Sequence, residues 1–168
     1  RFEHLEIIEA SPGIELSEAY CALFDCVFRE NHTLQSGGAI YAVGGTLDVD
    51  QCRFEGNSSR SGGAIMILSL SNDSTGNIIA NSAFIGNHAE VGGGALYWNC
   101  ADFRILDCEF DANTAGERGG AVLGIPGFEI PNAISRTRFS GNRAPLGGGL
   151  EYSVSSWGEW RFNELQFC

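Results

Sequence analysis

The side chains that could do chemistry in this sequence are its 21 acidic residues, six cysteines and three histidines. Paired carboxylates hydrolyse glycosidic bonds when they lie about 5 to 9.5 Å apart. Asp25 and Asp107 occupy the same place in two copies of a repeat described below, but two further copies separate them, which corresponds to roughly 14 Å. That row is therefore not a catalytic pair. Asp48 and Asp50, with Asp25, could bind a cation, although a solvated acidic edge is the preferred interpretation.

The cysteines and histidines suggest neither a metal centre nor a nucleophile. No Cys-x-x-Cys pair occurs, and His4, His32 and His88 do not combine with the cysteines at zinc-finger spacing. No Ser-His-Asp or Cys-His arrangement can be assigned, and His32 and His88 are expected to be solvent-facing turn residues. The sequence thus predicts no catalytic residue, no metal ligand, no cofactor and no enzyme activity.

Charge and hydropathy narrow the class of partner. Ten basic against 21 acidic residues give a formal net charge of -11, which repels nucleic acid and anionic lipid. No run approaches the roughly 20 apolar residues that cross a bilayer, so direct membrane insertion is not expected. The chain lacks both an initiator Met and a signal-peptide layout at its start, and is expected to be one segment of a longer protein.

Two short motifs recur along the chain in fixed order. Phe-x-x-Asn occurs five times, and Gly-Gly-Ala followed by an aliphatic residue stands five or six positions after each Asn, with Gly147-Gly148-Gly149-Leu150 as a variant. Successive Phe residues are 26, 30, 26 and 29 positions apart, and 28 more positions lead to Phe167. The repeats lie near residues 21–45, 47–70, 77–98, 103–124 and 132–152, with a partial copy at 160–168.

The pattern within each copy predicts strands rather than helices. The residue two positions before each Phe is small or apolar, the one five before is large and apolar, and the one three before is polar. This alternation has the period of a strand, and the Gly pair interrupts any helical run. We therefore expect an all-β chain that forms a single β-helix segment over residues 1–168, in which each coil pairs in parallel with its neighbours.

Equivalent residues of adjacent coils lie about 4.8 Å apart, so like side chains should stack on one another. The predicted Phe stack consists of Phe28, Phe54, Phe84, Phe110 and Phe139. The predicted amide ladder, with each Asn at a turn that tolerates a left-handed backbone, consists of Asn31, Asn57, Asn87, Asn113 and Asn142. Both rows are expected to be structural, and the Gly pairs are expected to permit a corner or a close backbone approach.

Three further features leave alternatives open. Cys26 and Cys52 lie in adjacent coils and could form a disulfide, with stacked free thiols as the preferred alternative. Of the sequons at Asn31, Asn57 and Asn72, only Asn72, in an inserted polar loop near 69–77, is expected to accept a glycan in a eukaryote. Tyr97, Trp98, Tyr152, Trp157 and Trp160 follow Gly motifs, and packing or lateral contact is preferred over glycan stacking.

The coupled motifs, with Cys two residues before Phe in three copies, resemble the passenger repeats of the chlamydial polymorphic membrane proteins. The resemblance covers residues from about 21 to the end and implies a right-handed parallel β-helix of about 26–30 residues per coil. It implies a non-enzymatic structural or adhesive module of a cell-surface protein or surface filament, located extracellularly or at the cell surface. The alternative is a polysaccharide lyase or hydrolase acting on acidic glycans. Expected partners are further coils or subunits at both ends, surface glycans, and host or cell-surface proteins.

Overall fold

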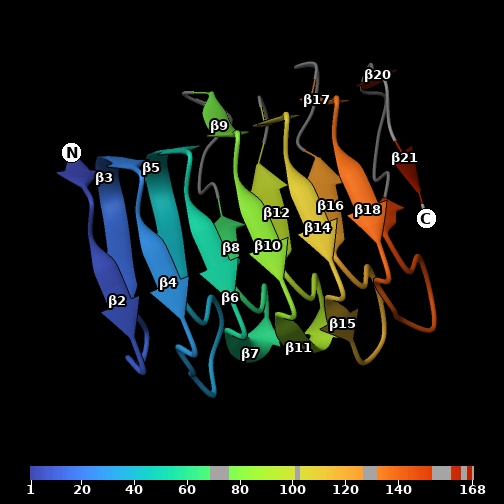
Figure 1. Cartoon of the computed structure of the whole chain (residues 1–168), viewed down its shortest axis with the longest axis horizontal. Helices are drawn as coiled ribbons and strands as arrows, with labels where there is room; N and C mark the ends of the chain where they lie inside the picture. The colour runs from blue at the N-terminus through green and yellow to red at the C-terminus, as the bar shows by residue number, and fades with distance from the viewer. Residues whose placement is uncertain (69–75, 101–102, 127–131, 153–159, 164–165, 168) are drawn as a thin grey trace.

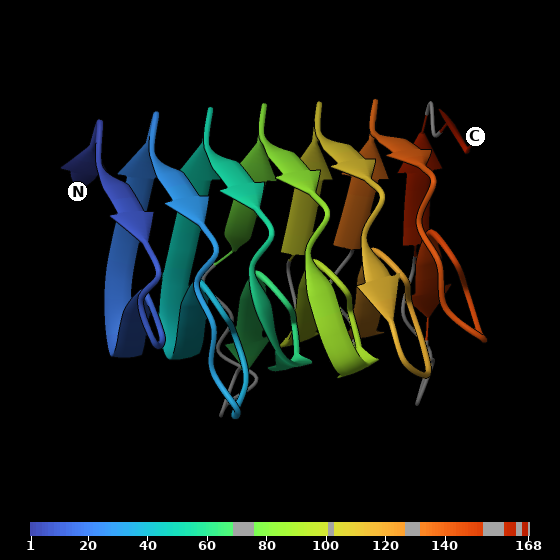
Figure 2. The same ribbon diagram turned by 60° about the horizontal axis from the view of Figure 1, so that its bottom comes forward.

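The computed structural model describes residues 1–68, 76–100, 103–126, 132–152, 160–163 and 166–167. All secondary structure in these ranges is β, and every described strand pair is parallel. Coil follows coil from the N-terminal to the C-terminal end of a solenoid (Figures 1 and 2). The expected all-β parallel β-helix is thus confirmed, and within the described residues no helix is long and apolar enough to span a membrane.

Three sheets form the walls of the solenoid. The 11-stranded sheet contains β1 (Phe2–Glu3), β3 (Ile14–Phe24), β5 (Ile40–Asp50), β8 (Ile65–Leu68), β9 (Asn77–Ala80), β12 (Leu96–Cys100), β13 (Phe103–Leu106), β16 (Val122–Pro126), β17 (Asn132–Ser135), β19 (Leu150–Tyr152) and β20 (Trp160–Asn163). The seven-stranded sheet contains β2 (Glu6–Ile8), β4 (Val27–Arg29), β6 (Arg53–Glu55), β10 (Ala83–Ile85), β14 (Glu109–Asp111), β18 (Arg138–Ser140) and β21 (Gln166–Phe167). The three-stranded sheet contains β7 (Ser58–Ser61), β11 (His88–Gly92) and β15 (Thr114–Ala115).

The seven-stranded sheet places each Phe of the repeat beside the next in exact register. Phe28 pairs with Phe54, Phe54 with Phe84, Phe84 with Phe110, and Phe110 with Phe139. The aliphatic residues five positions before each Phe are likewise buried, and they belong to the same core cluster as the Phe residues. The row of small residues two positions before each Phe, from Cys26 to Thr137, is buried as well. Together these rows make one continuous core along the solenoid axis.

Left-handed backbone marks the corners, but at other positions than the ladder Asn residues. The polar residue three before each Phe has a φ near +50°, for example Asp25 and Asp107. The residue immediately before each ladder Asn also has a positive φ, for example Gly56 and Gly86. No described ladder Asn has one. The ladder Asn residues therefore lie at turns, as expected, but the left-handed conformation that Asn tolerates is adopted by the residue before each of them.

The two glycines of each Gly pair have different roles. The first has a φ between +56° and +67°, the region that an L side chain rarely adopts. The second approaches the next coil so closely that a Cβ on Gly63 would lie 2.0 Å from the carbonyl oxygen of Gly94. The Gly pair therefore supplies both of the properties that its sequence pattern predicted.

One more coil precedes the first recognisable copy of the repeat. In it Ile7 pairs with Phe28, and Ile14 pairs with Ile40. Ala10 lies where the other coils have Asn, and its backbone N donates to Asn31 Oδ1 at 2.9 Å. The sequence motifs missed this coil because Ile replaces Phe, Ala replaces Asn, and the Gly pair is absent.

Candidate functional site

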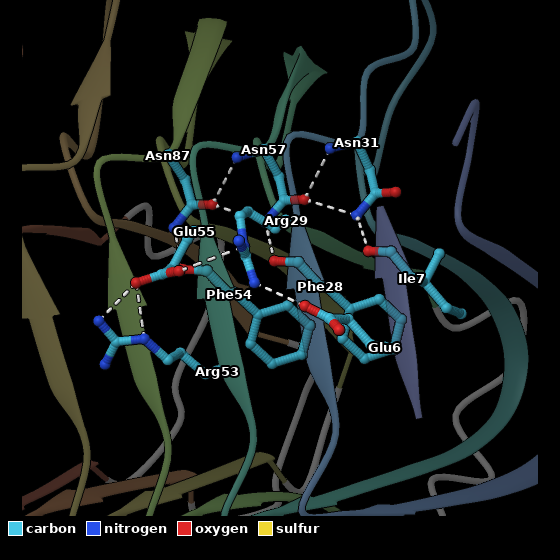
Figure 3. A network of polar contacts seen from close by, with 10 residues as sticks. All are labelled: Glu6, Ile7, Phe28, Arg29, Asn31, Arg53, Phe54, Glu55, Asn57 and Asn87. Atoms are coloured by element: carbon cyan, nitrogen blue, oxygen red, sulfur yellow. Dashed lines mark hydrogen bonds and ion pairs between the residues drawn. The ribbon is translucent and has the colours of Figure 1, made fainter. Parts of the chain in front are cut away.

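The amides of Asn31, Asn57 and Asn87 form consecutive steps of a buried ladder in the wall of the solenoid (Figure 3). Asn57 Nδ2 donates to Asn87 Oδ1 at 2.9 Å and to the carbonyl oxygen of Phe28 at 3.0 Å. The backbone N of Asn57 also donates to Asn87 Oδ1 at 2.9 Å. The same three bonds recur at Asn87 and Asn113. Asn142, which is only half-buried, accepts from Asn113 and donates to the Phe110 carbonyl.

These bonds engage both the oxygen and the nitrogen of each ladder amide, so the amides are structural rather than ligand-binding groups. Asn31, Asn57, Asn87 and Asn113 are all 0% exposed. A glycan on Asn31 or Asn57 would require the amide to leave both its neighbours and its wall, at a cost of several unsatisfied buried groups. Asn72, the sequon expected to be used, lies outside the described residues.

The Phe side chains lie in one continuous column. Ring centroids from Phe28 to Phe139 are separated by 4.9, 4.7, 4.7 and 5.1 Å, with interplanar angles of 7° or less. Each of these rings is at most 1% exposed. Burial of each ring contributes on the order of 1.5 to 3 kcal/mol, and ring contact adds about 0.5 to 1.5 kcal/mol.

Cys26 and Cys52 are free thiols in the structure, as are Cys21 and Cys108, so the disulfide that the sequence allowed is not formed. Each Sγ of the stacked row donates to the carbonyl two residues earlier: Cys26 to Phe24 at 3.3 Å and Cys52 to Asp50 at 3.3 Å. Cys52 Sγ also accepts from the backbone N of Cys26 at 3.4 Å. Burial raises the pKa of Cys52 and of Cys108 to about 12, so neither is a thiolate nucleophile at neutral pH.

The three aspartates considered as a cation site are each engaged separately. His4 Nδ1 lies 2.8 Å from Asp25 Oδ2, Tyr20 Oη donates to Asp48 Oδ2 at 2.9 Å, and Asn81 Nδ2 donates to Asp50 Oδ1 at 2.8 Å. Within the described residues, no group of three or more His, Cys, Asp or Glu side chains is placed to hold a metal ion.

The remaining histidines lie on the outer surface. His32 Nδ1 is 2.8 Å from Ser58 Oγ, and His88 Nδ1 is 2.9 Å from Thr114 Oγ1. Both rings are exposed, and each contacts a hydroxyl group at the equivalent position of the next coil. The two histidines therefore take part in side-chain contacts between adjacent coils on the outer surface. Their geometry resembles a surface ladder rather than a catalytic dyad.

The aromatic residues after the Gly motifs separate into different environments. Trp98 is 0% exposed and stacks on Phe103 with centroids 4.6 Å apart, while Tyr97 is half-buried. A Cβ on Gly124 would lie 2.4 Å from the Trp98 ring, so Gly124 provides the space for that side chain. Trp98 is thus a core residue and cannot stack on a sugar. The side chains of Tyr152 and Trp160, and all of Trp157, lie outside the described part of the chain.

Charged residues are paired across coils on the outer face of the seven-stranded sheet (Figure 3). Arg29 Nη2 lies 2.5 Å from Glu6 Oε1 and its Nε lies 3.7 Å from Glu55 Oε2, while Arg53 Nε donates to Glu55 Oε1 at 2.6 Å. Farther along, Arg136 makes two bonds to Asp107, at 2.6 and 2.7 Å. The Arg136 hydrogen bond lowers the pKa of Asp107, which is therefore held as a carboxylate and not as a general acid.

Fold and geometry together define a β-solenoid module. In its interior, equivalent Phe residues of adjacent coils stack on one another and equivalent Asn residues hydrogen-bond to one another. Residues 25–43 and 51–67 match the family model of the Chlamydia polymorphic membrane protein (Chlamydia_PMP) repeat. The chain therefore carries this repeat, which confirms the resemblance drawn from the two sequence motifs and assigns the module to a type found in a surface-protein family.

One curated relative extends the comparison beyond bacteria. The chain is 28% identical over 144 residues to "Metabotropic glutamate receptor-like protein R" of Dictyostelium discoideum. The alignment covers 84% of this chain but spans only 8% of the relative. No solved structure matches the chain.

Proposed function

We propose that the chain is a non-enzymatic structural or adhesive module in the extracellular part of a cell-surface protein. The observation that carries the proposal is the match of its repeats to those of a surface-protein family, on a solenoid whose polar interior groups bond to one another. The relative's receptor-like name supports the same location. The side chains left for partners are those on the outer faces of the sheets.

The chemistry of the described residues supports binding over catalysis. The ladder amides and stacked thiols are buried, and Asp107, the best-placed outward carboxylate beside an arginine, is held in its charged form. A lyase or hydrolase would need a base or a carboxylic acid close to the scissile bond. The described residues therefore favour binding, and a lyase or hydrolase activity is the alternative that the experiment below distinguishes from it.

An adhesion assay tests the proposal directly. Beads coated with residues 1–168 are presented to amoeboid and animal cells, and retention is counted under flow against beads coated with unfolded chain. A glycan array and a pull-down from cell-surface extracts run in parallel. The proposal expects retention that depends on the folded chain, and its failure on every surface would contradict the adhesive role. Release of unsaturated or reducing ends from polygalacturonate or alginate would instead establish the lyase or hydrolase function.

We also propose that further β-coils or another subunit cover the ends of the solenoid. At the N-terminal coil, Leu5, Ile7, Ile14 and Leu16 pack against the core but are only half-buried. Strand β2 is the edge of the seven-stranded sheet, so one row of its backbone groups has no strand beside it. A coil that continued the same register would cover both the apolar side chains and the backbone edge.

A further inference from the structure

A shallow trench follows the corner between the 11-stranded and seven-stranded sheets. Its larger part has a volume of about 450 Å³ and is lined by Asn81, Ser82, Ala83, Asp107, Cys108, Glu109, Arg136 and Arg138. A smaller part of about 200 Å³ is lined by Arg136, Thr137, Arg138 and Gln166. The two parts lie next to each other, since Arg136 and Arg138 line both.

The trench runs along the solenoid axis because equivalent residues line it. Ala83 pairs with Glu109, Glu109 with Arg138, and Arg138 with Gln166 in consecutive coils. The residue two before each Phe points into the core, so the backbone there forms the floor. The outward residues on either side of it form the walls. The short side chain of Ala83 leaves one wall low, whereas the preceding coil has Arg53 at that position.

Among the described residues, the charges that line the trench cancel. Asp107 and Glu109 balance Arg136 and Arg138, while the whole chain carries a formal charge of -11. The Arg136 guanidinium is fixed by its two bonds to Asp107, and Arg138 lies 3.8 Å from Glu109. An anionic polymer would meet no net attraction here and would be repelled by the rest of the surface. A cation would find each carboxylate beside an arginine.

We propose that this trench binds a neutral polysaccharide chain laid parallel to the solenoid axis. The Arg138 guanidinium supplies donors, and the carboxylates and Asn81 Oδ1 supply acceptors, so the walls match vicinal hydroxyl groups that both donate and accept. These walls run over three consecutive coils spaced about 4.8 Å apart, a length that favours a polymer over a single sugar. The volume of the larger part lies within the usual range for ligand sites, roughly 300 to 1,000 Å³.

The lining also sets the expected strength and chemistry of binding. None of the described residues that line the two parts is aromatic, so this lining offers no stacking platform and should bind each chain weakly. Many modules on one surface would raise the avidity. The inference rests on the proposed adhesive function and names its ligand class.

Affinity gel electrophoresis tests it with defined probes. The folded chain is run through native gels containing dextran, laminarin, mannan or xyloglucan as neutral polymers, and polygalacturonate or alginate as acidic ones. We expect retardation by at least one neutral polymer and none by the acidic polymers, with little change between 50 and 500 mM NaCl. Absence of retardation by every neutral polymer, or retardation by acidic polymers alone, would overturn the inference.

Matched variants locate the binding. The double substitution Glu109→Ala/Arg138→Ala removes one ion pair from the trench, while Glu6→Ala/Arg29→Ala removes an exposed ion pair from the same sheet outside it, both without changing net charge. We expect the trench variant to lose at least tenfold in affinity and the control less than twofold. Ala83→Arg, which fills the trench and leaves the ion pairs intact, should also abolish retardation. Binding by both trench variants at the wild-type level would refute the site.

The same variants keep the two proposals apart. Adhesion to cells by beads coated with the trench variant would place adhesion elsewhere. That result would contradict the trench's part in adhesion without contradicting the adhesive function. Retardation by a neutral polymer without any cell adhesion would leave the trench in place and contradict the adhesive function. Circular dichroism and urea midpoints equal to those of the unmodified chain establish that each variant is folded.

Discussion

At the scale of single residues, the residue type at an interior position is limited by the side chain and the hydrogen bonds of the equivalent position in the adjacent coil. The row two positions before each Phe contains Cys, Cys, Ser, Cys and Thr. Each of these side chains is small and carries an S–H or O–H group. Ser82 Oγ donates to the Ala80 carbonyl at 2.6 Å and accepts from the backbone N of Cys52 at 3.0 Å. Thr137 Oγ1 does the same for Ser135 and Cys108. The thiols are therefore best understood as stacked hydrogen-bonding groups.

The amide ladder makes the sharpest prediction at this scale, through Asn87→Asp. The change keeps the acceptor but removes the donor that bonds Phe54 O and Asn113 Oδ1, and it places a carboxylate against those two oxygens. We expect a loss of about 3 to 5 kcal/mol in the free energy of unfolding at pH 8, measured by urea denaturation. Burial and the facing oxygens should raise the pKa of the new carboxyl in the folded state.

The sign of the pH dependence follows from that raised pKa. A group with a higher pKa when folded contributes its full stability below the unfolded pKa and loses it as pH rises. The variant should therefore recover part of its deficit at pH 4. Asn99→Asp, which adds the same charge at an exposed position, serves as the control and should change stability by less than about 0.5 kcal/mol. A deficit that is equal at both pH values would contradict the buried-carboxylate account.

The Phe and Asn rows could be predicted from the sequence, but the backbone conformation of the turns beside them could not. Phe28 to Phe139 and Asn31 to Asn142 were evident because stacking demands the same residue type in each coil. The left-handed residue beside each Asn varies between Glu30, Gly56, Gly86, Ala112 and Gly141, so no residue type marks it. The space that Gly124 gives to Trp98 was likewise hidden, because it is a contact between neighbouring coils.

At the scale of elements, the corners decide whether short strands can stack at all. The strands of the seven-stranded sheet are two or three residues long, too short to hold their places by pairing alone. Each is joined to the next wall by a tight turn with positive φ or by a Gly pair. The close approach of backbone to backbone at the second Gly is therefore a condition of the fold.

Gly63→Ala tests that condition. Its φ is not positive, so the cost of the change comes from the added Cβ, which would lie 2.0 Å from Gly94 O and 2.4 Å from His88 O. Both atoms are backbone and cannot move without shifting a coil. We expect destabilisation by at least about 3 kcal/mol in thermal or urea unfolding.

The matched control is Gly86→Asn. Gly86 has a φ of +62° but a Cβ there would meet nothing within 4 Å. Because Asn tolerates the left-handed region, the cost should stay below about 1 kcal/mol. A loss at Gly86 as large as that at Gly63 would contradict this account, because a substitution without any close contact would then cost as much as one that clashes with two carbonyl oxygens.

The first coil shows where sequence motifs stop working. Ile7 lies only 21 residues before Phe28, because the connection from Ala10 to Ile14 is shorter than that from Asn31 to Ile40. Spacing and residue type therefore both depart from the repeat. Only the backbone pairing of β2 with β4 and of β3 with β5 places this segment in the solenoid. A coil at the edge of the described solenoid need not carry the full motif, since it has one neighbour.

At the scale of the whole molecule, a solenoid is a one-dimensional stack in which each coil contacts only its neighbours. Stability should therefore vary along the axis instead of being shared equally. Interior coils contain Phe and Asn that are 0% exposed and bonded on both sides. The first coil has half-buried Leu5 and Ile7 and pairs through β2 on one side.

Hydrogen exchange should resolve this gradient. We expect amides of Glu6–Ile8 to exchange at least tenfold faster than those of Ala83–Ile85, because the first coil opens locally whereas the third Phe-bearing coil opens only with its neighbours. Ile7→Arg should widen the difference by weakening the contact with Phe28, and Ile85→Arg, at a half-buried outward position of β10, is the control that should leave it unchanged.

If a second subunit stacks on this end, raising the protein concentration should slow exchange at Glu6–Ile8 in the unmodified chain but not in Ile7→Arg. Uniform protection along the axis at low concentration would mean that the N-terminal coil is already a stable cap, and the proposal that another coil or subunit covers it would fail.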